Sequence, residues 1–250
     1  MRSLVRLRVA AAALAALTVA VPSAPARPLQ APPRVCEGLT ICSPIAGPWV
    51  VVPGPTRPGR MGSAVWQLSC PRGFVGGLDA RISDPWIEVR FPGLMGSPVN
   101  PGITTRRTVV FNASSVGPIR RPASFIPFVG CIPGEGGPRT PAGVASPTKA
   151  AAPAQLGLGP ISRHVRVVEV RQRVVHAGLA CPRGRRLVSS AAVLGIYSAL
   201  KPTLGQLRKV SVTSSVAHGR IFITARRTTL SPTISVQVQI HALCTGSFST

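Results

Sequence analysis

The most regular hydrophobic pattern in the chain lies near its C-terminal end. From 234 to 244, apolar residues occupy every second position, and the polar residues between them include Gln237, Gln239 and His241. A period of two residues is the signature of a strand with one buried side. We therefore predict a strand here, with Cys244 on its apolar side. His241 is predicted on its polar side, either exposed or hydrogen-bonded locally.

Shorter strand patterns recur along the chain, and no sustained period of 3.6 residues indicates a helix. In one of them Ile87, Val89 and Phe91 alternate with Glu88 and Arg90. Frequent Pro and Gly turn signals separate these segments, which is typical of all-β proteins. The other strand-like segments are 49–52, 64–70, 104–112, 124–131, 165–175, 187–194, 196–200, 210–216 and a segment that begins at 221.

One tetrapeptide occurs twice: Cys70-Pro71-Arg72-Gly73 returns as Cys181-Pro182-Arg183-Gly184. Each copy is followed about sixty residues later by another cysteine, Cys131 or Cys244. We interpret this frame as one β-domain used twice, each copy a sandwich or a small barrel. The hexamers that begin at Ile103 and Ile223 also resemble each other, but their offset of 120 differs from that of the cysteines, so chance explains the resemblance and the cysteine frame is the stronger evidence.

Six cysteines allow fifteen pairings, and the repeat selects among them. Equivalent bridges would be Cys70–Cys131 and Cys181–Cys244, which leaves Cys36–Cys42 to close a short loop. A bridge from Cys181 to Cys244 can join the two layers of a sandwich. No two cysteines have the C-x-x-C spacing of common zinc sites, so we predict disulfides and no metal.

Residues 1–26 match an export signal. Three arginines precede an apolar run from 9 to 21, and Ala24-Pro25-Ala26 offers a cleavage site. The run is shorter than the roughly twenty residues that span a bilayer. We predict a secreted or extracytoplasmic protein that can associate with the cell surface. Its predicted parts are a signal peptide (1–26), an irregular Pro-rich segment (27–48), β-domain 1 (49–133), a flexible linker rich in Pro, Gly and Ala (134–160) and β-domain 2 (161–250).

The formal charge is +23, from 29 basic and 6 acidic residues, and nearly all the basic residues are arginine. A GC-rich genome would favour Arg, Ala, Gly and Pro without selection for function. Such a surface nevertheless attracts anionic polymers and lipid head groups. With only 11 aromatic residues there is no evident stacking platform for bases, so we predict no specific nucleic-acid recognition. The candidate anion-binding residues are Arg106, Arg107, Arg183, Arg185, Arg186, Arg226 and Arg227.

Catalytic motifs are weak. Ser198 and Lys201 fit S-x-x-K but lack the partner motifs of acylating enzymes. The only acidic cluster is Asp79, Asp84 and Glu88. The four histidines, none in a metal-hydrolase motif, are His164, His176, His218 and His241.

We therefore predict an exported, non-catalytic binding protein without a cofactor, which associates with anionic polymers or surfaces of the cell envelope. Two alternatives remain at this stage. One is a secreted hydrolase with a dispersed active site, built from the acidic cluster or a histidine. The other is a purely structural surface protein.

Overall fold

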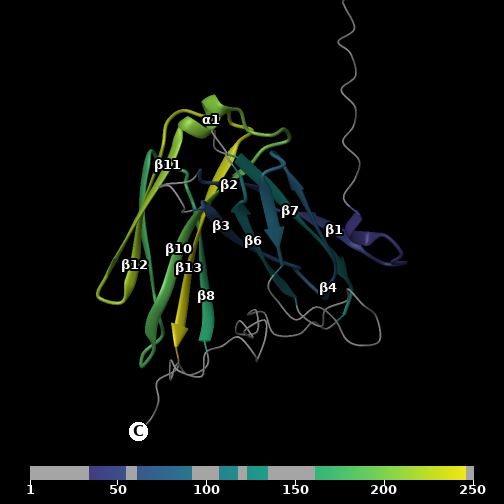
Figure 1. The fold of residues 1–250 in the computed structure, drawn as a ribbon, viewed down its shortest axis with the longest axis horizontal. Coiled ribbons are helices and arrows are strands. Elements are labelled where there is room, and N and C mark those ends of the chain that lie inside the picture. Colours follow the sequence, from purple (N-terminus) through teal and green to yellow (C-terminus); the bar gives the residue numbers. More distant parts are fainter. Residues whose placement is uncertain (1–33, 55–60, 92–106, 118–122, 135–160, 246–250) are drawn as a thin grey trace, which may run out of the picture. The chain divides into compact units, whose positions relative to one another are not determined.

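The computed structural model describes residues 34–54, 61–91, 107–117, 123–134 and 161–245. In these ranges the regular structure is nearly all strand, so the all-β prediction is confirmed (Figure 1). The exceptions are a 3-10 turn, η1 (Arg34–Cys36), and a five-residue helix, α1 (Leu204–Arg208). No described helix has the length and apolar character needed to cross a membrane. The predicted signal (1–26) and nearly all of the predicted linker lie outside the described residues.

The strands fall into two halves, before and after the predicted linker. The first half holds β1 (Ser43–Ala46), β2 (Trp49–Val52), β3 (Ser63–Ser69), β4 (Phe74–Ile82), β5 (Ile87–Arg90), β6 (Thr108–Ser115) and β7 (Ala123–Ile132). The second half holds β8 (Ile161–Glu169), β9 (Val174–Ala180), β10 (Arg186–Tyr197), β11 (Val210–Ala217), β12 (Arg220–Arg227) and β13 (Ser235–Thr245).

Several segments differ from the prediction. β4 was not predicted, and the segments expected at 187–194 and 196–200 form one strand, β10, which ends at Tyr197. The interval 27–48, expected to be irregular, contains η1 and β1. The segment of β1 is extended because it pairs with β7, the strand with which the following β2 also pairs. The valine-rich stretch 165–175 is not continuous. It divides between β8 and β9, where the backbone bends at Gln172-Arg173 and the side chains of 171–173 are exposed.

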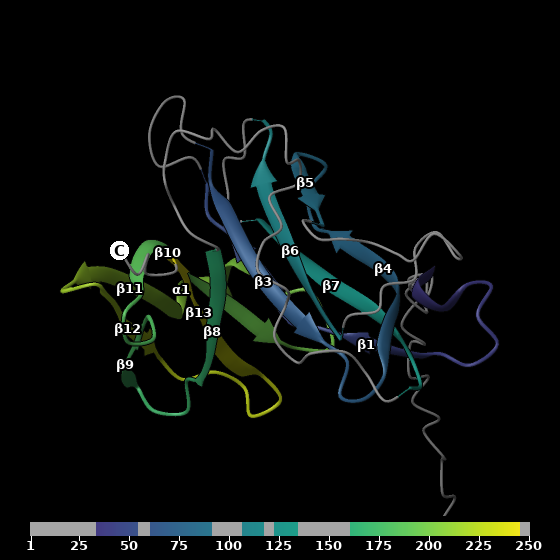
Figure 2. The ribbon, with the colours of Figure 1, turned by 90° about the horizontal axis from the view of Figure 1, so that it is seen from below.

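One sheet of seven strands runs through both halves. β7 pairs with β4 on one edge and with β1 and β2 on the other, and the sheet continues through β10, β13 and β8. The remaining strands form two three-stranded sheets, β3-β6-β5 and β11-β12-β9, which stand apart in Figure 2. Each packs on the long sheet over its own hydrophobic cluster, one around Phe125 and one around Val238. Each half therefore keeps a core, while the division into two separate domains stays a prediction.

Both halves have the same pairing pattern. β3 pairs with β6, β6 with β5 and β4 with β7 in the first half; β9 pairs with β12, β12 with β11 and β10 with β13 in the second. The two tetrapeptide copies occupy equivalent turns, before β4 and before β10. Their glycines have the same positive φ, 77° at Gly73 and 76° at Gly184, a region that residues with a Cβ adopt rarely.

The bulge that follows each turn is also equivalent. The ladder between β4 and β7 skips one residue after Val75, which pairs with Cys131. The ladder between β10 and β13 skips one residue after Leu187, which pairs with Cys244. The matching hexamers, in contrast, do not correspond, since Thr108 begins β6 whereas Thr228 follows the end of β12.

The three predicted disulfides are present. Cys70–Cys131 and Cys181–Cys244 each tie the end of a three-stranded sheet to the long sheet. Cys36–Cys42 closes the short loop before β1. Such bonds are compatible with an oxidising, extracellular location.

The halves meet where β2 pairs with β10, through Trp49 opposite Ile196 and Val50 opposite Gly195. Gly195 is required at this point: a Cβ there would lie 2.6 Å from the indole Cη2 of Trp66 and 2.5 Å from Cγ of Pro48. Nearby, the supposedly polar side of β13 is covered, and His241 is only 1% exposed. The prediction that His241 faces solvent or bonds only locally is therefore wrong.

Candidate functional site

Charge is distributed unequally between the halves. Residues 161–245 contain thirteen basic side chains and one acidic side chain, Glu169, whereas the described residues between 34 and 134 contain five basic and four acidic ones. Glu169 is already paired with Arg171, at 2.8 Å between carboxylate and guanidinium. Within the described part of the chain, the second half therefore carries most of the uncompensated positive charge.

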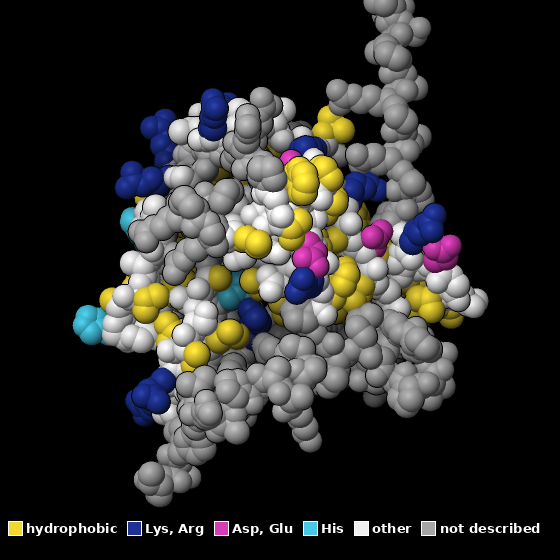
Figure 3. Space-filling model, in the orientation of Figure 1, with side chains coloured by type: hydrophobic (Ala, Val, Ile, Leu, Met, Phe, Trp, Pro, Cys, Tyr) yellow, Lys and Arg dark blue, Asp and Glu magenta, His cyan; other side chains and the backbone are white. Residues whose placement is uncertain are grey.

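The arginines do not form one continuous patch. In Figure 3 the Lys and Arg side chains lie at several separated places on the face shown, with hydrophobic and neutral polar side chains between them. A local site must therefore be found from the strands that present these side chains.

The clearest such site is the outer side of the β9-β12-β11 sheet. In β12, Ile221, Ile223 and Ala225 are buried in the core, so the alternating positions Arg220, Phe222, Thr224 and Arg226 point the other way. Residues directly opposite on paired strands share a side of the sheet. We call this surface the β12 face; its members are Arg220, Phe222, Thr224 and Arg226 of β12, Ser211, Thr213, Ser215 and Ala217 of β11, and Val174, His176, Gly178 and Ala180 of β9.

An exposed aromatic ring occupies the middle of the β12 face. Phe222 is 40% exposed, and the Arg220 guanidinium lies 5.8 Å from the centre of its ring. Gly178, opposite Phe222, places no side chain beside the ring; a Cβ there would lie 3.3 Å from Phe222 Cδ1. Nδ1 of His176 lies 3.0 Å from the Thr224 hydroxyl. The face thus combines a partly exposed ring, hydroxyl groups and cations, and it contains no carboxylate.

The structure divides the predicted anion-binding arginines. Arg226 is exposed on the β12 face, whereas Arg227 turns inward and donates to the Val170 carbonyl at 2.9 Å. Arg107 donates to the Pro71 carbonyl in the first tetrapeptide. These two arginines therefore have structural partners, and Arg106 lies outside the described residues.

The other predicted arginines lie in the second tetrapeptide or directly after it. Arg183, Arg185 and Arg186 are all exposed. Arg185 donates to the Ser162 hydroxyl at 2.6 Å, and this hydroxyl lies 3.1 Å from Nε2 of His164. Within the described ranges no carboxylate bonds to His164, so the serine and histidine lack the orienting acid of a hydrolytic triad.

The acidic cluster serves local structure. Asp79 accepts from the Ala80 amide at 2.7 Å, and Asp84 accepts from the Trp86 amide at 2.9 Å. Glu88 pairs with Arg90 at 2.8 Å, and this guanidinium holds the pKa of the carboxyl below its usual value. A general acid needs a raised pKa, so the geometry does not favour Glu88 in that role.

The buried histidine belongs to the junction of the halves. Its Nδ1 lies 3.3 Å from a guanidinium nitrogen of Arg163, so this nitrogen accepts and the ring is neutral. Burial and, second, the Arg163 charge lower the pKa of His241 to about 3. His218 has another role: with φ of 50° it forms, with Gly219, the two-residue turn between β11 and β12.

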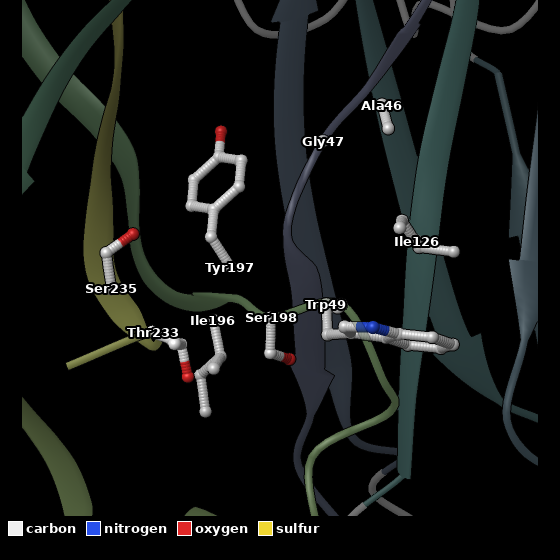
Figure 4. Close-up of a pocket in the computed structure, with 10 residues that line it drawn as sticks. Ala46, Gly47, Trp49, Ile126, Ile196, Tyr197, Ser198, Thr233 and Ser235 are labelled. Carbon is white, nitrogen blue, oxygen red and sulfur yellow. The ribbon is translucent and has the colours of Figure 1, made fainter. Parts of the chain in front are cut away.

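A pocket of about 350 Å³ lies at the junction, beside the pairing of β2 with β10 (Figure 4). Its apolar side chains include Trp49, Ile126 and Ile196, and Tyr197 and three hydroxyl residues complete it. No charged side chain is among its ten lining residues. Burial raises the pKa of Tyr197, which keeps the phenol neutral.

The S-x-x-K motif at this pocket does not form a catalytic pair. The Ser198 hydroxyl donates to the Leu200 carbonyl at 2.6 Å, and Lys201 Nζ donates to the Ser83 carbonyl at 3.2 Å. Each group thus has another partner. The described residues also contain no group of three or more His, Cys, Asp or Glu able to hold a metal.

Sequence reasoning missed Arg220 and Phe222 as members of a site. The signal was available, because these residues alternate with Ile221 and Ile223 in a predicted strand. No family model, curated protein or solved structure matches this chain.

Proposed function

We propose that this protein is an exported, non-catalytic binding protein that associates with anionic polymers of the cell envelope, mainly through its second half. The observation that carries the proposal is the charge of residues 161–245, where thirteen basic side chains accompany one carboxylate that is already paired. A linear polyanion gains from many such cations at once, because each contact releases condensed counterions.

The proposed organisation is two disulfide-stapled β-domains joined by residues 134–160. It is supported by the shared pairing pattern and by the equivalent turns and bulges of the two halves. In this arrangement the first half, with its nearly balanced described charges, is the scaffold on which the cationic half is held. The disulfides, together with the signal-like residues 1–26, support an extracytoplasmic location.

The test is salt-dependent retention of the oxidised chain on beads that carry dextran sulfate, with neutral dextran beads as the control. We expect binding to the sulfated matrix in dilute buffer and elution above about 0.15 M NaCl, near the ionic strength at which the protein would work. The neutral beads should retain nothing. Elution of the whole chain well below that salt concentration would remove this function, since weak exchange is expected of any basic protein.

A further inference from the structure

We propose that the β12 face is the binding surface for an acidic polysaccharide, whose chain lies along β12 with one sugar ring on Phe222. This inference rests on the proposed function and deepens it, since it names the ligand class and the residues. Its ligand chemistry is a sugar chain that carries carboxylate or sulfate groups.

The cations of the face have a fixed spacing. Arg220 and Arg226 lie six residues apart on the same side of one strand, which corresponds to about 20 Å along the sheet. Both are exposed, and the neighbouring positions on the face are Ser, Thr, Ala, Gly, Val and His. A polymer with repeated negative charges can reach both guanidinium groups, whereas a small anion reaches only one.

The middle of the face distinguishes a sugar from a simple polyanion. Phe222 stands between the two arginines and packs over Gly178, where a Cβ would lie 3.3 Å from its ring, and 40% of the side chain stays exposed. The apolar C–H face of a sugar ring packs on an aromatic ring, and its hydroxyl groups bond to neighbouring hydroxyls. Ser211, Thr213 and Ser215 provide a row of exposed hydroxyls along the adjacent strand.

Other polyanions fit this face less well. A single-stranded nucleic acid is normally held by several rings on which successive bases stack, and this face has one ring. A membrane surface engages a broad apolar area, but Phe222 lies here among arginine and hydroxyl side chains. Both therefore serve as contrasting probes in the test.

The test compares two double variants of equal charge. Arg220→Gln/Arg226→Gln removes the cations of the β12 face, and Arg183→Gln/Arg186→Gln removes two exposed cations near the second tetrapeptide. With polygalacturonate and dextran sulfate as probes, we expect the first variant to lose affinity about tenfold or more and the second less than threefold. If wild type binds but both variants lose affinity equally, the face is wrong and the general function stands. If wild type does not bind, the function itself fails.

A single variant tests the sugar. We expect Phe222→Ala to weaken binding to polygalacturonate at least fivefold and to leave binding to inorganic polyphosphate unchanged. Equal loss on polyphosphate, on a single-stranded DNA or on vesicles of anionic lipid would overturn the polysaccharide assignment, as would no loss on polygalacturonate. Because Phe222 and both arginines are exposed, unfolding midpoints of all variants should match wild type, which checks that folding is not the cause.

Discussion

The side-chain amide of Gln239 makes two hydrogen bonds to the backbone of Gln67. The Gln67 N–H donates to Oε1 at 2.8 Å, and Nε2 donates to the Gln67 carbonyl at 2.8 Å. These are the two bonds that a peptide group of an adjacent strand would make. Gln239 is 5% exposed, so this amide links β13 to β3 in a site that excludes most water.

We expect Gln239→Ala to lower the free energy of unfolding by about 2–3 kcal/mol. The substitution leaves the N–H and carbonyl of Gln67 without partners in a largely buried place, where each unmade bond is costly. Denaturant unfolding followed by tryptophan fluorescence measures the loss. The control is Gln237→Ala, two residues earlier on the same side of β13 and less buried, for which we expect about 0.5 kcal/mol or less. Equal losses would mean that the paired bonds contribute nothing specific.

His241 should make the protein sensitive to acid. In the folded state its pKa is lowered from 6.5 to about 3, whereas the unfolded ring titrates normally. Below pH 6.5 the unfolded chain therefore binds a proton that the folded chain does not. Above pH 6.5 the titration of His241 does not reduce the free energy of unfolding. Between pH 6.5 and 3 this free energy falls as the pH is lowered, by up to about 1.4 kcal/mol per pH unit.

The matched variant for this prediction is His241→Gln, which stays polar but does not titrate. Between pH 6.5 and 5 the carboxylates remain ionised, so they contribute little to the difference between the two proteins. We expect the stability of wild type, minus that of the variant, to decrease through this interval. Parallel curves would contradict the assigned pKa.

Local patterns predicted the strand of β13 and the position of Cys244, because alternation is a property of neighbouring residues. They did not predict that Gln239 and His241 would be covered. The partner that covers them is β3, whose Gln67 lies 172 residues away and offers backbone groups that any residue would offer. No local signal in the sequence specifies such a contact.

Cysteine positions were more informative than composition. The repeated frame predicted the two long-range bridges, since equivalent sheets need equivalent ties, and it left Cys36 and Cys42 to form the third. Charge predicted anion binding only in general terms: Arg226 and Arg227 are adjacent in sequence, yet one is exposed and the other bonds the Val170 carbonyl. Adjacent residues of a strand point to opposite sides of the sheet. Which of the two arginines is exposed can therefore be predicted only when the register of β12 is known.

The two long-range bridges should contribute more to stability than the short one. Cys181–Cys244 closes a separation of 63 residues and Cys36–Cys42 one of 6. In the chain-entropy description these loops correspond to about 4 and about 2 kcal/mol. We expect the double alanine variants to lose stability in that order, as measured by calorimetry under oxidising conditions. The reverse order would show that the short loop holds η1 and β1 by contacts that the entropy argument omits.

Gly195 should not tolerate a side chain. Its hydrogen faces Trp66, and an added Cβ would lie only 2.6 Å from the indole and 2.5 Å from Pro48, so the strands β2, β3 and β10 would have to move apart. We expect Gly195→Ala to cost about 1–3 kcal/mol and to change the near-UV signal of Trp66. The control is Gly205→Ala in α1, where the nearest atom lies 3.8 Å away and alanine favours the helix. This control should be neutral or stabilising. If Gly195→Ala is equally harmless, the close approach of Trp66 to β10 is not needed to hold the two halves together. The structure around the neighbouring pocket should then also accommodate the added methyl group.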